Sequence, residues 1–559
     1  MRGGFTRCLG LAVAFLLTGN AALGSAEAPV PPGTHVFVNQ VGYLPSLPKT
    51  VVCDRPAGEF TVRVEETGEP VFRGRLTPFT DATSGKRVWR GDFRELSIPG
   101  RYYVEVPGVG ASYPFRIGED VYRDVLRLGL RFYYLQRCGI ALEDPETGLT
   151  HSACHGDDAY LWYTDPFNEK GGRWATVGGW HDAGDYGKYV STTAVTVAHL
   201  LCLYELWPAL YKDGSLRIPE SGNGLPDILD EARVGLDWLL TMQRPDGAVY
   251  HKVGGVRWPT LVGPDVDTGP RYVYGISTFA TAKFAAVMAA AARVFRNLDP
   301  VYADRCTDAA GRAWDYLKTH GFAWEHDDFD DEGSGAYGQT DDAADRLWAA
   351  AELTLLGEEI EELEDRLEGY TPNSIGWTDA ALLGLFDLAR SEAVPAALRR
   401  LAAEKIALAA EKHFRATKAS AFGYTLHYGD FGWASNKEAL ARGMVMLFAD
   451  RLQPNPDYRA AALAQLDFVL GLNPLSKCYV TCLGSDPVRM PHHRFDATAP
   501  KSVPGMLVGG PNNCAESGAE PYGLGPYSYI DSRASYSSNE PAIDYNAAFV
   551  FVAAAFTGP

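Results

Sequence analysis

The segment GGWHDAGDYGKYVSTTAVTVAHLLCLYELW, residues 178–207, decides which fold this sequence can adopt. It opens with a loop rich in glycine and aromatic residues that holds two carboxylates, Asp182 and Asp185, around a glycine. A segment with helical periodicity, Val190–Trp207, follows at once. A polar loop that leads directly into a long helix predicts a helical scaffold whose loops carry the function.

Helical periodicity extends over most of the chain, whereas strand signal is nearly absent after Ile117. We find no fixed-period repeat, so closure of paired helices into a toroid is the alternative to a solenoid. The expected helices are Val121–Leu135, Val190–Trp207, Asp227–Met242, Thr278–Phe295, Ala309–Leu317, Ala343–Leu355, Trp377–Ala389, Ala397–His413, Ala439–Leu452, Tyr458–Leu470 and Ala542–Phe556.

The first part of the chain follows a different pattern. Short β-branched or aromatic runs alternate with turn residues such as Pro56–Gly58, a spacing typical of a small β-sandwich. The runs are Val36–Val38, Thr50–Val52, Thr61–Val64 and Tyr102–Val106. The sequence therefore predicts a β-sandwich over residues 29–117 and an all-α domain over residues 118–559.

The N-terminus predicts export. Arg2 and Arg7 flank the start of an apolar run, Leu9–Thr18, and Ala26–Ala28 provides an A-x-A cleavage site. The run is shorter than the roughly 20 residues that span a bilayer, which argues against a membrane anchor. We therefore expect residues 1–28 to be a signal peptide and the mature protein to be secreted, either extracellular or periplasmic.

The composition narrows the class of partner. A formal net charge of −19 repels phosphate backbones and anionic lipids, so we expect neither a nucleic acid nor a membrane partner. A neutral polymer meets no such repulsion. The 12 Trp and 29 Tyr suit stacking on sugar faces, although they suit a large core equally well. We expect a monomer.

Two segments hold candidate acid–base groups. Asp182 and Asp185 precede a predicted helix, whose N-terminal dipole and N–H groups would keep a carboxylate ionised, as a general base requires. Glu540 lies at the start of the last predicted helix, close to Tyr536 and Tyr545. Aromatic and acidic neighbours would keep Glu540 protonated and able to donate a proton. Helix capping is the competing interpretation for both segments.

A third segment holds His492 and Arg494 two residues apart in a loop. Their imidazole and guanidinium groups could contact neighbouring hydroxyls of one sugar ring. The pair His492 and His493 could instead bind a metal, but no Cys or carboxylate stands at a convincing spacing nearby.

Two other groups of residues are candidate metal sites. Two thiols and two imidazoles form a set suited to tetrahedral zinc, although their spacing is not that of a zinc finger: Cys138, Cys154, His155 and His181. A Cys138–Cys154 disulfide is the alternative in an exported protein. Three acids after a glycine-rich turn offer hard oxygen ligands for calcium, with helix N-terminal acids as the competing interpretation: Asp227, Asp230 and Glu231.

The loop around Asp185, the segment around His492 and the segment Tyr529–Ala547 together resemble glycoside hydrolase family 9, cellulases built on an (α/α)6 toroid. Gly432–Asn436 and Val508–Asn512 also look similar to this family. The β-rich segment resembles the immunoglobulin-like module that many members carry. The resemblance implies a small N-terminal immunoglobulin-like β-sandwich followed by an all-α (α/α)6 catalytic domain.

The resemblance also implies roles for individual residues. Asp185 would be the base that activates water, Asp182 would help to hold that water, and Glu540 would be the general acid. Four residues would contact the sugar: His492, Arg494, Tyr536 and Trp433. Asp531 would support the acid and its loop. Family members with the immunoglobulin-like module often carry a structural zinc at the positions that match the Cys138 group.

These inferences define three hypotheses for function. The leading one is a secreted, inverting glycoside hydrolase that cleaves β-1,4-glucosidic bonds in cellulose or related soluble β-glucans and acts within the chain. An exo-acting β-glucosidase, cellobiosidase or exo-β-glucosaminidase on oligosaccharides is an alternative. The third is a carbohydrate-binding protein without activity, and the presence of Asp182, Asp185 and Glu540 argues against it.

Overall fold

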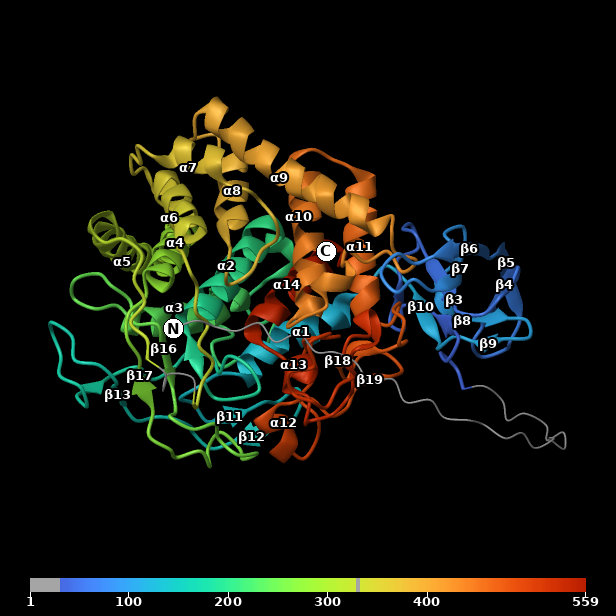
Figure 1. Cartoon of the computed structure of the whole chain (residues 1–559), viewed down its shortest axis with the longest axis horizontal. Coiled ribbons are helices and arrows are strands. Elements are labelled where there is room, and N and C mark those ends of the chain that lie inside the picture. Colours follow the sequence, from blue (N-terminus) through green and yellow to red (C-terminus); the bar gives the residue numbers. More distant parts are fainter. Residues whose placement is uncertain (1–30, 328–331, 559) are drawn as a thin grey trace, which may run out of the picture.

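The structure, a computed structural model, describes residues 31–327 and 332–558 (Figure 1). The predicted signal peptide lies outside these residues. In Figure 1 the N-terminal strands form a small blue unit beside a much larger helical body.

The N-terminal unit is the predicted β-sandwich. One sheet has the strand order β1 (Val36–Phe37), β3 (Thr50–Cys53), β7 (Arg87–Asp92) and β6 (Thr77–Thr80). The other has the order β2 (Gly42–Tyr43), β10 (Phe115–Ile117), β8 (Gly100–Val106), β4 (Glu59–Val64) and β5 (Pro70–Arg75), and β9 (Gly110–Ala111) pairs with β8. Aromatic rings fill the core, where Tyr43 meets Phe93 and Phe115 edge-on at 5.2 Å.

The helical body is a closed double ring, which confirms the predicted (α/α)6 toroid. The inner ring contains α2 (Val190–Leu206), α4 (Thr278–Phe295), α6 (Ala343–Leu356), α8 (Ala381–Arg390), α10 (Ser435–Leu452) and α14 (Ile543–Ala555). Each of these helices packs against the next, and α14 closes the ring against α2. Their outer partners are α1 (Arg123–Leu135), α3 (Asp227–Thr241), α5 (Pro300–Thr319), α7 (Leu363–Gly369), α9 (Ala396–Thr417) and α11 (Pro456–Val469).

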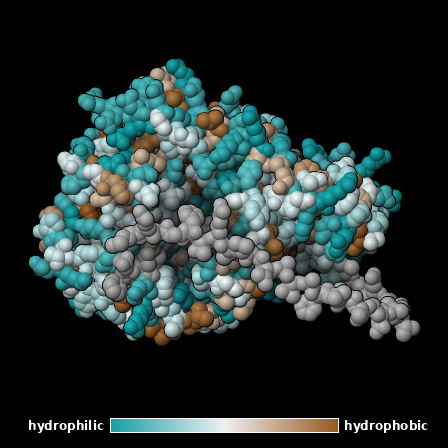
Figure 2. Space-filling model, viewed as in Figure 1, coloured by the Kyte–Doolittle hydropathy of each residue, from teal (hydrophilic) through white to brown (hydrophobic). Residues whose placement is uncertain are grey.

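The sequence of the inner helices explains their position. Helices α2, α4 and α14 are buried on nearly all sides, as expected for helices that are apolar all round. Helix α4 is long and apolar enough to cross a membrane, but 89% of it is buried inside the protein, so it is a core helix. Figure 2 shows that polar residues cover most of the viewed face and that apolar side chains are scattered over it.

The structure corrects three details of the sequence prediction. Helix α5 begins at Pro300 rather than at Ala309, because Asp299 caps it and proline occupies its first turn. Helix α8 begins at Ala381, so Trp377 lies in the preceding loop. Strands are also present after Ile117: β14 (Arg173–Trp174), β13 (Ala159–Leu161), β17 (Tyr272–Val273), β16 (Lys252–Gly254) and β15 (Lys188–Tyr189) form a five-stranded sheet.

The two units are joined by specific contacts. The ring of Phe37 lies 5.8 Å from that of Phe422. Asn39 donates a hydrogen bond of 2.7 Å from Nδ2 to Oδ1 of Asp467 in α11. The buried carboxylate of Asp81 accepts a hydrogen bond of 3.0 Å from the N–H of Ala421. The sandwich therefore packs on the ring through both apolar and polar groups.

Candidate active site

The loop with Asp182 and Asp185 connects β14 to β15 of the five-stranded sheet. The N–H of Asp182 donates to the carbonyl of Gly187 at 2.9 Å, and the Lys188 ammonium donates to the carbonyls of Thr176 and Gly178 at 2.7 and 2.9 Å. Strand β15 then leads directly into α2. These bonds give the loop a defined shape although it has little regular structure.

The start of α2 does not hold Asp185, contrary to our sequence prediction. Its Oδ1 accepts a hydrogen bond of 2.8 Å from the N–H of Gly187, inside the loop itself. Burial raises the pKa of Asp185, whereas the Arg494 guanidinium and the Gly187 N–H oppose that rise. Asp185 is thus kept ionisable by neighbouring charges and a local N–H group, not by a helix dipole.

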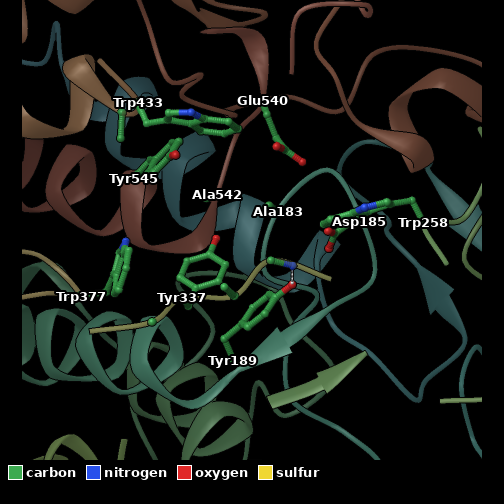
Figure 3. A pocket seen from close by; sticks show the side chains of 14 residues that line it. Ala183, Asp185, Tyr189, Trp258, Tyr337, Trp377, Trp433, Glu540, Ala542 and Tyr545 are labelled. Atoms are coloured by element: carbon green, nitrogen blue, oxygen red, sulfur yellow. Dashed lines mark hydrogen bonds between the residues drawn. The ribbon is translucent and has the colours of Figure 1, made fainter. Parts of the chain in front are cut away.

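Glu540 comes from the C-terminal part of the chain and lies beside the loop that contains Asp185. It lies just before α14, and its Oε1 accepts a hydrogen bond of 3.1 Å from the N–H of Gly184. Burial, together with the nearby Asp185, raises the pKa of Glu540 well above 4.5. In Figure 3 both carboxyl groups point into one cavity. Burial raises the pKa of both carboxyls, and that of Glu540 is raised further by Asp185, so two carboxyls in different electrostatic settings share one cavity, as general acid–base chemistry requires.

The cavity has a volume of about 390 Å³, and six of the 14 residues that line it are aromatic (Figure 3). The rings that line it are Tyr189, Trp258, Tyr337, Trp377, Trp433 and Tyr545. The sequence analysis assigned no role to Trp258, Tyr337 or Trp377. Position in a long loop between helices was the one available signal, and Trp377 lacked even that because it was assigned to a helix.

Asp182 is fully buried and is not one of the residues that line the cavity. The hydroxyl of Tyr337 donates to its Oδ2 at 2.7 Å, and the hydroxyl of Thr192 in the first turn of α2 donates to its Oδ1. Burial, with Asp544 adding to the effect, raises the pKa of Asp182 to about 8. Asp182 therefore ties the catalytic loop to α2 and to the cavity wall, and both of its oxygens already have protein donors.

His492 and Arg494 lie near Asp185, and Arg494 also interacts with Glu540. The Nδ1 of His492 lies 2.6 Å from the carbonyl oxygen of Arg533, so this nitrogen is the donor and Nε2 is an acceptor. Arg494 was predicted to grip sugar, but it is only 6% exposed. Its N–H and Nη1 donate to the carbonyl of Gly184 at 2.9 and 3.0 Å, and its Nε donates to that of Pro259 at 2.8 Å. Arg494 therefore holds the base loop.

Asp531 supports the loop that leads to His492. It accepts hydrogen bonds of 2.9 Å from the N–H groups of both Arg489 and Met490, and it pairs with Lys477 at 3.0 Å. Burial opposes ionisation of Asp531, but the Met490 N–H and Lys477 outweigh it and lower its pKa. Asp531 also accepts a bond of 3.3 Å from Asn539, the residue before Glu540.

Two exposed rings extend the cavity wall. Trp433 is 48% and Tyr536 is 39% exposed, and their ring centres lie 5.9 Å apart. The Tyr536 hydroxyl donates to the carbonyl of Glu516 at 2.8 Å, which fixes the ring beside that of His492. The other histidine, His493, caps α12 (Arg494–Thr498) and lies 2.9 Å from Gln136, so His492 and His493 form no metal-binding pair.

The four predicted zinc ligands come together. Their ligand atoms lie within 4.8 Å of one another, and all four side chains belong to one group: Cys138, Cys154, His155 and His181. Sγ of Cys138 lies 3.9 Å from Nδ1 of His155, and Sγ of Cys154 lies 4.0 Å from Nε2 of His181. The two ring nitrogens are 3.1 Å apart. The structure has Cys138 and Cys154 as free thiols. Zinc bonds of about 2.0–2.1 Å to nitrogen and about 2.3 Å to sulfur fit a tetrahedron of this size.

The calcium prediction for Asp227, Asp230 and Glu231 stays a prediction, and the structure shows protein partners for two of these acids. Asp227 accepts hydrogen bonds from the N–H groups of Gly214 and Leu216, and Glu231 pairs with Arg137 at 2.8 Å. Among residues 31–327 and 332–558, these three acids do not form a group of ligand atoms that could share an ion. Their positions in and near the first turn of α3 explain them as helix N-terminal and ion-pairing acids.

Known protein families match both units of the chain. The sequence model of glycosyl hydrolase family 9 matches residues 122–553, and that of the cellulase N-terminal ig-like domain matches residues 32–111. The chain belongs to glycosyl hydrolase family 9. The helical ring of this family 9 protein therefore carries the catalytic site, and its β-sandwich is the immunoglobulin-like unit.

Individual relatives agree with this assignment. Endoglucanase D of Acetivibrio thermocellus is 34% identical over 94% of this chain and 83% of its own length. A metagenome-derived family 9 endoglucanase is 47% identical, with a TM-score of 0.90 over 94% of this chain and 99% of that one. A zinc-binding triple mutant of another family 9 endoglucanase is 38% identical, with a TM-score of 0.87 over 92% of this chain and 100% of that one.

Proposed function

We propose that this protein is an exported endo-β-1,4-glucanase that hydrolyses cellulose or a related soluble β-glucan with inversion at the anomeric carbon. The observation that carries the proposal is the placement of Asp185 and Glu540 on one cavity with aromatic walls. Membership of a glycosyl hydrolase family and the endoglucanase relatives support the reaction and its substrate class.

The reaction is a single displacement. Asp185 removes a proton from a water molecule, whose oxygen bonds to the anomeric carbon from the face opposite the leaving group. As the glycosidic bond breaks, Glu540 donates its proton to the leaving oxygen. The β-linked chain yields an α-anomer, and Asp185 and Glu540 have then exchanged protonation states and must return to their starting states.

A neutral glucan fits the lining of the cavity. Flat aromatic rings such as Trp258, Trp377 and Trp433 offer faces on which the apolar faces of sugar rings can stack. The net charge of −19 is no obstacle to an uncharged chain. We retain from the sequence the expectation of a secreted monomer that meets its substrate outside the cytoplasm.

Zinc at the Cys138 group is part of the proposal. Two thiolates and two imidazoles form a closed ligand set with no place for substrate, so the ion would have a structural role. Asp267 Oδ2 lies 3.3 Å from Nε2 of His155 and would orient that ring in the way that carboxylates orient metal-bound histidines. Because His181 precedes Asp182, the site would anchor the catalytic loop.

Two measurements on one reaction test the proposal. Proton NMR of the first minutes of cellohexaose hydrolysis should show the α-anomer ahead of mutarotation, and early β-anomer would overturn inversion. Viscosity of a soluble β-glucan should fall much faster than reducing ends accumulate, because cuts within the chain shorten it most. A slow viscosity loss with one short product would instead mean exo action, and no hydrolysis of any β-glucan would reject the enzyme assignment.

A further inference from the structure

Arg271 contacts the catalytic loop one residue beyond Asp185. Its Nη2 donates to the carbonyl of Tyr186 at 2.6 Å. Its own carbonyl accepts from the N–H of Tyr160 at 2.9 Å, and β17 begins at the next residue. The backbone of Arg271 is therefore fixed by the five-stranded sheet, while its guanidinium reaches the loop that carries the base.

Arg494 makes the matching contact on the other side of Asp185. Its N–H and Nη1 both donate to the carbonyl of Gly184, the residue before Asp185. The carbonyls on either side of Asp185 thus accept hydrogen bonds from two guanidinium groups. These groups come from distant parts of the chain, one from the small sheet and one from α12. Together they restrain the two residues adjacent to Asp185, which determine where its carboxylate points.

We propose that Arg271 is a positioning residue that holds the backbone after Asp185 and supplies positive charge that favours the ionised base. The proposal rests on the proposed function, because it requires Asp185 to act as the base. Arg494 alone cannot perform this role, since it binds the carbonyl on the other side of Asp185.

The charges around Asp185 show why a second cation matters. Arg271 acts on Asp185 in the same direction as Arg494 and His492, and all three oppose the rise in its pKa caused by burial. Within the described residues 31–327 and 332–558, Arg271 makes no salt bridge to a carboxylate, so its charge is not neutralised by direct contact. The other titratable groups that interact with Asp185 are Asp182, Tyr189 and Glu540.

The neighbouring Cys138 group does not cancel this charge. Zinc held by two thiolates and two neutral imidazoles has no net charge, because the two negative charges balance the ion. Arg271 also interacts electrostatically with the nearby Asp267, whose pKa it helps to lower, and it still favours the ionised form of Asp185. Its contribution to the base can be separated from metal binding by measuring the zinc content of each variant.

The test compares Arg271→Gln and Arg271→Lys with a matched control, Arg173→Gln. Glutamine removes the charge and lysine keeps it. Arg173 lies in β14 of the same sheet, is exposed and contacts Tyr160 rather than the loop. The measurements are kcat and KM on a soluble β-1,4-glucan across pH, zinc content and thermal stability of the full-length protein.

We expect Arg271→Gln to lower kcat about 10-fold with little change in KM, because the base is misplaced rather than the substrate. The acidic limb of the kcat profile should move up by about 1 pH unit, because a base that has lost a nearby cation is ionised only at higher pH. Arg271→Lys should lower kcat but keep the acidic limb in place, and Arg173→Gln should match the wild type in both.

An unmoved acidic limb in Arg271→Gln would overturn the proposal, even if kcat and thermal stability fell, because that pattern means a purely structural role. Should Arg271→Gln fail to fold, an acidic limb that shifts in Arg271→Lys would overturn it equally. Failure of the proposed function would look different. It would appear as full activity in Asp185→Ala, a measurement that does not involve the Arg271 variants.

Discussion

Gly184 determines how closely the loops of the acid and the base can approach. A Cβ at this position would lie 1.9 Å from the carbonyl oxygen of His492 and 3.0 Å from Oε1 of Glu540. Because Gly184 has no side chain, its N–H can donate to Glu540 and its carbonyl can accept from Arg494. Gly184 therefore connects Glu540, Asp185 and Arg494 through its own backbone.

At the residue scale we expect Asp185→Ala and Glu540→Gln each to lose about 10²- to 10⁴-fold in kcat, the usual contribution of one acid–base group. Asp182→Ala should lose less than Asp185→Ala, because Asp182 is buried, does not line the cavity and binds protein hydroxyls through both oxygens. Steady-state kinetics on a soluble β-glucan measures this, and circular dichroism verifies folding. The exposed Asp304 provides the control Asp304→Asn. Turnover close to the wild type in Asp185→Ala would reject its role as base.

The pH dependence follows from Glu540. The acid must be protonated to donate, and burial and Asp185 hold its pKa well above 4.5. Activity should therefore persist through weakly acidic pH and fall as the pH rises through the pKa of Glu540. The alkaline limb of kcat/KM reports this value for the free enzyme. An alkaline limb near 4.5 would show that Glu540 titrates like a solvent-exposed carboxyl.

At the scale of elements, the Cys138 group links three segments: the end of α1, the loop with Cys154 and the catalytic loop. We expect one zinc ion per chain. Strong chelation should lower the melting temperature, and activity should fall only as the loop that contains Asp185 loses its fixed structure. Cys154→Ser should lower zinc content, whereas Cys306→Ser, at a buried thiol in α5, should not. An elemental analysis that finds no zinc, together with a mapped Cys138–Cys154 disulfide, would show that a disulfide takes the place of the zinc site.

At the scale of the whole molecule, Asp467 connects the β-sandwich to the helical ring. Its Oδ1 accepts from Asn39 at 2.7 Å and lies 3.4 Å from the Tyr122 hydroxyl. Burial raises the pKa of Asp467 to about 7, while these two hydrogen bonds oppose the rise. An unfolded aspartate titrates near pH 4, at about 3.9. The folded protein therefore holds a proton on Asp467 that the unfolded chain has released.

The sign of the resulting effect is definite. Because the folded state binds more protons, this carboxyl makes the free energy of unfolding decrease as the pH rises from about 4 to about 7. Denaturant unfolding of Asp467→Asn should show a weaker decrease over that range than the wild type. Asp457→Asn, an exposed change in the same helix, should keep the wild-type slope. Parallel slopes in Asp467→Asn and the wild type would contradict this linkage.

The sequence was a reliable guide wherever a signal is local. The inner helices could be located because long apolar segments such as Thr278–Phe295 have helical periodicity whatever surrounds them. Their ends were less certain, since helix boundaries depend on caps such as Asp299. Two-residue strands such as β15 were missed, because they form only when distant partners hold them.

Local sequence patterns were enough to predict the helical class, the N-terminal β-sandwich and the residue types available for catalysis and for zinc. The tertiary structure was needed to show that Arg494 binds the Gly184 carbonyl, that Asp182 accepts from Tyr337, and that Asp227 and Glu231 bind Leu216 N–H and Arg137. It also brought Trp258 and Trp377 onto one cavity. The physical reason is ring closure: α14 packs on α2, which helps to set Glu540 beside a loop more than 350 positions earlier in the chain.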